Sequence, residues 1–217
     1  MRALIAVGTG RYADPWHPFA ENGARVAEIL ADDGWTVEVD PDVDHALTAL
    51  EGVDLLVVAA GDPWAETVVS APAASQQGLV DATARGLGIL ALHTATASLR
   101  GYPHWAALLG AVWLPQVSMH PPYEDAAQVR VLADHALADG LADFTVSDER
   151  YARLQLVGRS EVLADHAHEG ERYPLIWTRE VGRARVAYDA LGHDTRSYDS
   201  GPHREIIRRL ARWAGRA

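Results

Sequence analysis

The sequence contains no cysteine and no lysine, and each absence excludes a class of chemistry. Without cysteine there is no disulfide, no thiolate metal ligand and no cysteine nucleophile. All 19 basic residues are arginine, so a Schiff-base lysine and the lysine of a phosphate-binding P-loop are excluded as well. Phenylalanine is scarce, with two residues, whereas the chain carries 10 histidines. Histidine and carboxylate chemistry remain open.

The sequence also lacks a long apolar run and an excess of positive charge. No stretch approaches the roughly 20 apolar residues that span a bilayer, and the opening run "ALIAV" is too short for a signal peptide. We therefore expect no membrane partner and a cytoplasmic location. The formal net charge of −11 argues against a nucleic-acid partner, because phosphate binding needs a basic face. Assembly into a homo-oligomer stays open.

Short apolar runs alternate with helical patterns, which is typical of a parallel sheet covered on both faces. We predict a single α/β domain over residues 1–217, with a doubly wound, mainly parallel, flavodoxin-like sheet. The expected helices cover 20–34, 43–52, 75–86 and 201–215. The expected central strands, adjacent to one another, are 3–7, 53–59, 86–92 and 184–190, with a further strand at 35–40. Between 111 and 185 the alternating segments "AQVRVLA" and "ARLQLVG" predict antiparallel edge strands.

Polar residues follow the predicted central strands. In doubly wound sheets ligands bind beyond the carboxyl ends of the strands. Those ends read Gly8-Thr9-Gly10, Gly61-Asp62, His93-Thr94 and Gly192-His193-Asp194. Two strand-end histidines on one edge predict a functional site, and we expect His17 and His120, from neighbouring loops, to line the same pocket.

The residue types suggest three roles in that pocket. Neutral imidazole is a common metal ligand, so His93, His120 and His193 are candidate ligands of a divalent metal such as zinc. No H-x-x-H spacing occurs, so a site without a metal stays open. A carboxylate beside a histidine can move protons, and the candidate catalytic residues are His93, His193, Asp148 and Glu149. The candidate substrate-binding residues are His17, Thr94, Trp105, Asp194 and Tyr198.

Several of these residues also have structural interpretations. Asp148 and Glu149 could form a charged turn, Asp194 could cap a loop, and Trp105 could pack in the core. Four further histidines lie in polar stretches and are expected at the surface: His45, His135, His166 and His168. His203 is expected to neighbour the cap of the last helix.

Several motifs resemble the successive signature blocks of the ThuA-like (trehalose-utilisation) family. They are "GTGRYADPWHPF", "GILALHTATASLRGYPHWAALLGAVW", "MHPP", "VSDERY" and "RVAYDALGHDTRSY", followed by "REIIRRLARWA". The resemblance covers nearly the whole chain and implies a class I glutamine-amidotransferase-like fold without the elbow cysteine. The residues that match the polar signature of the family are His17, His93, His120, Asp148, Glu149 and His193. The chain departs from the family pattern in two places: D-E-L-Y reads here as "DERY", and the segment after "LLG" reads "AVWLPQVSMHPP".

The resemblance implies a role in carbohydrate metabolism, because family members are linked to the uptake and breakdown of disaccharides and oxidised sugars. Two classes of function follow. The first is an enzyme of hydrolase, lyase or isomerase type, not an amidotransferase, that acts on a sugar or oxidised-sugar small molecule. The second is a non-catalytic sugar-binding or regulatory module that uses the same pocket.

The motif "GTGRYA" matches a dinucleotide fingerprint, but we predict that it binds neither NAD nor FAD. A fingerprint needs a helix that begins inside the motif, so that its N-terminus meets the pyrophosphate. Here Pro15 and Pro18 follow, and they displace the helix start to about residue 18. Titration with either nucleotide, followed by fluorescence or calorimetry, should show no saturable binding. A dissociation constant in the micromolar range would contradict this.

Overall fold

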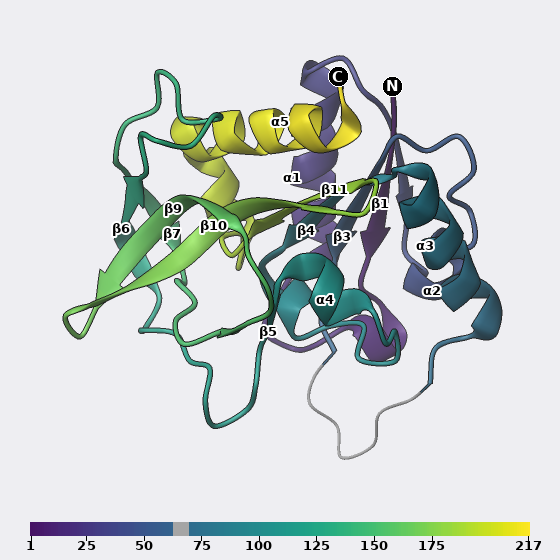
Figure 1. The fold of residues 1–217 in the computed structure, drawn as a ribbon. Helices are drawn as coiled ribbons and strands as arrows, with labels where there is room; N and C mark the ends of the chain where they lie inside the picture. The colour runs from purple at the N-terminus through teal and green to yellow at the C-terminus, as the bar shows by residue number, and fades with distance from the viewer. Residues whose placement is uncertain (63–69) are drawn as a thin grey trace.

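The structure is a computed structural model in which residues 1–62 and 70–217 are described. Its main sheet has nine strands in the order β2-β1-β3-β4-β11-β10-β9-β6-β7 (Figure 1). These strands are β1 (Arg2–Val7), β2 (Thr36–Asp40), β3 (Leu55–Ala59), β4 (Gly88–Leu92), β6 (Glu124–Val131), β7 (Phe144–Asp148), β9 (Glu161–His168), β10 (Glu171–Val181) and β11 (Ala184–Asp189). A separate two-stranded sheet pairs β5 (Ala111–Val112) with β8 (Gln155–Leu156).

The helices are α1 (Phe19–Asp32), α2 (Val43–Ala46), α3 (Ala73–Arg85), α4 (Trp105–Leu109) and α5 (Gly201–Gly215). Three short 3-10 helices follow strand ends: η1 (Gly10–Tyr12), η2 (His93–Thr96) and η3 (Thr195–Asp199). None of the helices in the described residues is long and apolar enough to cross a membrane.

The strands β2, β1, β3, β4 and β11 run parallel to one another. Helices α1 and α5 pack together on one face of this parallel half, whereas α2 and α3 lie on the other (Figure 1). Burial on both faces explains the continuous apolar strands: every residue of β3 and β4 is buried. The predicted fold class is confirmed, and the four central strands are adjacent in the order β1-β3-β4-β11.

The second half of the sheet is antiparallel and departs from the predicted elements. "AQVRVLA" lies largely in β6, but "ARLQLVG" contributes only the two residues of β8. Residues with positive φ stand near both ends of β8, at Arg153 (57°) and Gly158 (74°), and they turn the chain out of an extended path. The helix expected at 43–52 is a single turn, α2, because the chain leaves helical geometry after Leu47.

The parallel half brings four strand ends to one edge of the sheet. After β1 the chain forms η1 and then a loop, and α1 begins at Phe19, directly after Pro18. The "GTGRYA" segment therefore opens no α-helix, only the 3-10 helix η1, and the loop that follows carries His17 toward the ends of β4 and β11. This arrangement positions the candidate site.

Close packing of α5 on β4 depends on Gly88. A Cβ atom at this position would lie 2.5 Å from the backbone carbon and oxygen of Ala214. We expect Gly88→Ala to lower the free energy of unfolding by about 2–3 kcal/mol, because α5 must move away from the sheet. Gly201→Ala is the control, since its Cβ would meet nothing within 4 Å. Urea denaturation measures both, and equal stabilities would contradict the close contact.

Asp165 joins three strands of the antiparallel half. Its carboxylate, on β9, accepts hydrogen bonds from Arg130 Nε on β6 at 2.9 Å and from Arg172 Nε on β10 at 3.0 Å. Burial acts to raise the pKa of this carboxyl, but the two guanidinium groups outweigh it and hold the pKa below its ordinary value. The ionised form is therefore more stable in the folded protein than in the unfolded chain.

A carboxyl with a depressed pKa stabilises the fold above its unfolded pKa, and this stabilisation is lost as the pH falls through the folded pKa. We expect Asp165→Asn to lower the free energy of unfolding by about 1 kcal/mol at pH 7, allowing for the exposure of both arginines. The difference from wild type should shrink below about pH 4. Asp125→Asn, at a side chain that is 90% exposed, is the control and should show no such dependence. A pH-independent difference would contradict the assignment.

Candidate functional site

A cleft with a volume of about 730 Å³ opens at the carboxyl edge of the parallel strands. Five of the predicted site residues line it: His17, Thr94, His120, Glu149 and His193. Three aromatic residues for which no site role was predicted also line it: Trp16, Trp113 and Tyr151. The cleft combines imidazole and carboxylate groups with aromatic walls, so it can hold a small polar molecule with an apolar face.

His93 stands at the sharp turn from β4 into η2, with a φ of 41°. Positive φ is uncommon for a residue with a Cβ, and such strain concentrates at functional sites. Its Nδ1 lies 2.6 Å from the carbonyl of Ala190, which can only accept, so Nδ1 carries the proton. Nε2 is left with a free lone pair, which lies 3.8 Å from Glu149 Oε2 just beneath the residues that line the cleft. Burial, followed by the neighbouring His17, lowers the pKa of His93 well below its ordinary value, so the ring is neutral at pH 7.

His17 is oriented in a similar way by a carboxylate. Its Nδ1 lies 2.7 Å from Asp14 Oδ1, and Nε2 faces away from this pair. Burial acts to raise the pKa of Asp14, but the His17 ring and the backbone N–H groups of residues 16 and 17 outweigh it and keep the pKa low. A carboxylate that fixes the tautomer of a histidine is the usual support of a metal-ligating imidazole.

His193 and Glu149 face each other across the floor of the cleft. Their closest atoms, Nδ1 and Oε2, are 3.4 Å apart, and the same Oε2 lies 3.8 Å from His93 Nε2. Burial lowers the pKa of His193, but the charge of Glu149 outweighs this effect and the pKa is raised overall. Burial raises the pKa of Glu149, but His193 and then His120 outweigh it and the pKa is lowered overall.

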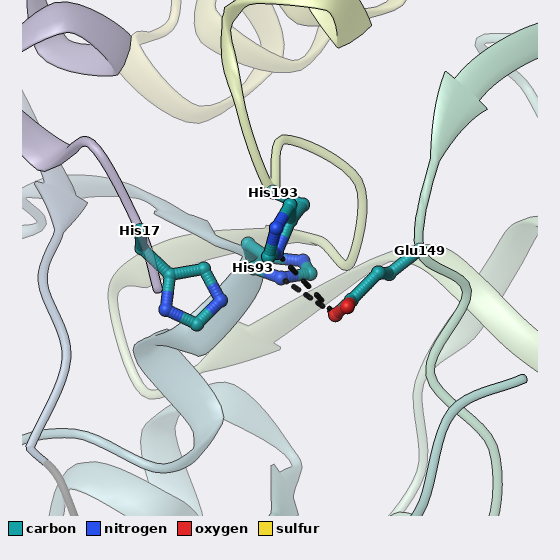
Figure 2. Close-up of side chains that lie close together, drawn as sticks. All are labelled: His17, His93, Glu149 and His193. Atoms are coloured by element: carbon teal, nitrogen blue, oxygen red, sulfur yellow. Dashed lines mark ion pairs between the residues drawn. The ribbon is translucent and has the colours of Figure 1, made fainter. Parts of the chain in front are cut away.

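Four side chains thus converge on one point: His17, His93, Glu149 and His193 (Figure 2). They offer one ligand atom each, and these four atoms lie within 4.8 Å of one another. Three of the atoms are buried without a hydrogen-bond partner: His17 Nε2, His93 Nε2 and His193 Nδ1. Buried polar atoms are normally hydrogen-bonded, but here His93 Nε2 and His193 Nδ1 have only their ion-pair contacts to Glu149, and an explanation is required.

His120 lies in the cleft but outside this group of four. Its Nδ1 lies 2.9 Å from the carbonyl of Pro121 and 3.5 Å from Glu149 Oε1. The side chain is 38% exposed, and its ring centroid is 6.1 Å from that of Trp113. Of the predicted ligands His93, His120 and His193, the structure groups His93 and His193 with His17 and Glu149, and it holds His120 further out.

Asp148 was expected to be catalytic, but it lies beneath the cleft and is fully buried. Its carboxylate accepts hydrogen bonds from the backbone N–H groups of Glu149, Gly192 and His193, at 2.8, 2.7 and 3.0 Å. Burial raises the pKa of Asp148 to about 6. Since the side chain does not reach the cleft, it acts on the site through the backbone it holds.

The structure places three of the predicted substrate-binding residues away from the cleft. Trp105 is 3% exposed, and its indole N–H donates to the carbonyl of Ala95. Tyr198 is 1% exposed and stacks on His203. Asp194 caps η3 and pairs with Arg196. Because the rings of Trp105 and Tyr198 are buried in the core, they cannot contact a ligand in the cleft. The substrate-binding role predicted for these two residues does not fit the structure.

Thr94 lines the cleft, and its hydroxyl donates to the carbonyl of Ala60 at 2.8 Å. Of the histidines expected at the surface, His135 and His166 are buried. The His135 ring bonds to Thr178 Oγ1, and His166 Nε2 bonds to the carbonyl of Tyr151, whereas His166 Nδ1 is buried without a hydrogen-bond partner. His203, expected beside a helix cap, is also fully buried. The surface position predicted for His135 and His166 from their polar neighbours in the sequence is therefore wrong.

Sequence reasoning missed Asp14 and the aromatic walls of the cleft. Asp14 stands three residues before His17, and that spacing within one loop was the only available signal. Trp16 is 66% exposed at the cleft, which is unusual for so large an apolar side chain. Trp113 and Tyr151 pack with ring centroids 4.6 Å apart, and Tyr151 also lies on His93. These contacts join segments that are distant in the sequence.

The fold and the cleft define an α/β protein with a histidine-lined site at the carboxyl edge of its parallel strands. The model of the ThuA family, described as trehalose utilisation, matches residues 2–214. The chain belongs to this family, and the predicted resemblance is confirmed. No curated protein matches the sequence.

Solved structures show the same fold at low sequence identity. A putative ThuA-like protein from Parabacteroides merdae is 16% identical, with a TM-score of 0.77 over 99% of this chain and 89% of that one. Another, from Bacteroides uniformis, is 16% identical, with a TM-score of 0.74 over 98% and 90% of the two chains. A cytoplasmic protein from Salmonella typhimurium is 13% identical, with a TM-score of 0.63 over 99% of each chain.

Proposed function

We propose that the chain is an enzyme of carbohydrate metabolism that acts on a sugar or an oxidised sugar at a divalent metal centre in the cleft. The observation that carries this proposal is the convergence of three unpartnered imidazole nitrogens on Glu149. The metal ligands are His17, His93, Glu149 and His193. The description of the Salmonella structure as a cytoplasmic protein supports a cytoplasmic location for this chain.

The donor set fits a borderline divalent ion such as zinc, which takes imidazole and carboxylate ligands. Tetrahedral ligands at about 2.0–2.1 Å from one ion lie about 3.4 Å apart. The observed atoms lie within 4.8 Å of one another, so the side chains would rotate inward to hold an ion. The Ala190 carbonyl and Asp14 already hold the protonated Nδ1 of His93 and His17 away from the centre, so both rings present a lone pair to it.

When bound, the metal supplies Lewis-acid activation of a carbonyl or of a water molecule. The chain contributes the proton transfer. Because the Pro121 carbonyl binds the Nδ1–H of His120, the opposite nitrogen of this ring is an acceptor. His120 is partly exposed within the cleft and close to Glu149, so it can take a proton from a substrate hydroxyl or from water and return it to the product.

The aromatic walls support a sugar as the bound molecule. Trp16 and Trp113 present broad apolar faces, which can pack against the C–H face of a pyranose ring, while the histidines and Glu149 meet its hydroxyl groups. A cleft of about 730 Å³ has room for a disaccharide. This chemistry agrees with the family description, trehalose utilisation.

The first test removes one ligand at a time. Chelator-treated protein is titrated with Co²⁺, which gives visible absorption bands on binding, and turnover of trehalose, other disaccharides and their keto derivatives is followed by mass spectrometry. We expect one ion per chain in wild type. His93→Ala and His193→Ala should each weaken binding by at least 100-fold and abolish turnover. His93→Ala should also lower the melting temperature of the metal-free protein, because its ring is buried and bonded to the Ala190 carbonyl, whereas His193→Ala should change it little.

His135→Ala is the matched control, because His135 is buried like His93 but bonds to Thr178 outside the cleft. It should lower stability and leave the Co²⁺ affinity unchanged. A wild type that binds no stoichiometric metal would contradict the metal centre. Metal or sugar binding without turnover of any sugar would instead support a binding module over an enzyme.

A further inference from the structure

A series of hydrogen-bonded, buried polar side chains runs beneath the cleft from the end of β11, through α5 and η3, to the end of β7. It consists of Asp189, His203, Ser197 and Asp148, and all four residues have an exposed fraction of 0%. His203 Nε2 lies 2.9 Å from Asp189 Oδ2, and its Nδ1 lies 2.9 Å from Ser197 Oγ. The Ser197 hydroxyl donates to Asp148 Oδ2 at 2.5 Å. None of these four side chains lines the cleft.

The hydrogen-bond roles in this series determine its charge. Ser197 gives its proton to the Asp148 carboxylate, so it offers a lone pair to His203 Nδ1. That nitrogen is also 3.0 Å from the backbone carbonyl of Ser197, and the other ring nitrogen faces a carboxylate. Both ring nitrogens of His203 therefore donate, which makes the ring a cation between two carboxylates.

Asp189, His203 and Ser197 occur in the order of a catalytic triad, but the arrangement does not suit nucleophilic catalysis. In a triad the serine proton passes to a neutral imidazole and the hydroxyl oxygen faces the substrate. Here the serine is sealed from solvent, it donates to Asp148 instead, and the imidazole carries both of its protons. These hydrogen-bonded side chains instead immobilise the carboxylate of Asp148.

The loop after β11 is held from two sides. The Asp148 carboxylate accepts from the N–H groups of Gly192 and His193, while the Asn22 side chain on α1 donates to the carbonyls of the same two residues at 2.9 and 3.2 Å. Asp148 also accepts from the N–H of Glu149. One carboxylate thus fixes the backbone of both His193 and Glu149, which follow different strands.

We propose that Ser197, His203 and Asp189 are positioning residues that lock Asp148 and, together with Asn22, set the spacing between His193 and Glu149 in the cleft. This inference rests on the proposed metal centre for its effect on function. The placement of the backbone is a separate claim, which can be measured without a metal. Supports of metal ligands typically change metal affinity by about 10–100-fold when removed.

The test variant is Ser197→Ala, which removes one hydroxyl group and so interrupts the series of buried hydrogen bonds between His203 and Asp148. Ser75→Ala is the matched control, since Ser75 is also buried and donates one hydrogen bond, to the carbonyl of Asp44. Three quantities are measured: the melting temperature, the amide hydrogen exchange of Gly192 and His193 by NMR, and the Co²⁺ dissociation constant. Asn22→Ala is a second variant, which acts on the same loop from the opposite side.

We expect both serine variants to lower the melting temperature to a similar extent. Ser197→Ala alone should speed exchange of the two amides at least tenfold and raise the Co²⁺ dissociation constant by about 10–100-fold. Asn22→Ala should change both quantities in the same direction. The proposal is overturned if Ser197→Ala and Ser75→Ala leave exchange and affinity equally unchanged.

The two proposals fail in distinguishable ways. If wild type binds no Co²⁺, the metal centre is wrong, and the exchange data alone decide whether the buried series positions the loop. If wild type binds Co²⁺ and Ser197→Ala binds it equally well with unaltered amide exchange, the metal centre stands and the positioning role is wrong.

Discussion

The hydrogen bonds of the Asp148 carboxylate are the interaction on which the rest of the site depends. A buried carboxylate is costly unless it is fully hydrogen-bonded, and here three backbone N–H groups and one hydroxyl satisfy it. Those N–H groups belong to the end of β7 and to the loop after β11. The halves of the sheet are joined by the pairing of β10 with β11, and this one carboxylate ties the end of β7 to the loop after β11 at the edge where the cleft lies.

Around the cleft, the role of each histidine follows from what binds its far side. A backbone carbonyl behind His93 and a carboxylate behind His17 fix the tautomers and leave one unpartnered nitrogen on each ring. His135 is buried as well, but its two ring nitrogens bond to Thr178 Oγ1 and to the backbone N–H of Leu137. His203 has acceptors on both sides and is held as a cation. The same side chain thus serves as a candidate ligand, a core residue or a buried charge.

Much of the fold could be predicted, because burial on both faces of a parallel sheet leaves a clear mark in the sequence. The central strands carry continuous apolar runs, and strand ends in this topology share one edge, which brought His93 and His193 together as expected. The antiparallel half was predicted less well. Its strands are half exposed, and pairings such as β6 with β9 join segments far apart in the chain, so local patterns hardly record them.

The sequence by itself determined the α/β architecture, the absence of thiol and lysine chemistry and the edge at which polar groups gather. Only the tertiary structure decided which of those groups face the cleft. Asp148 and Tyr198 lie beneath it, whereas His17 reaches the cleft from a loop and is oriented there by Asp14. The physical reason is that periodicity encodes burial along one element, whereas the direction of a polar side chain depends on partners supplied by other elements.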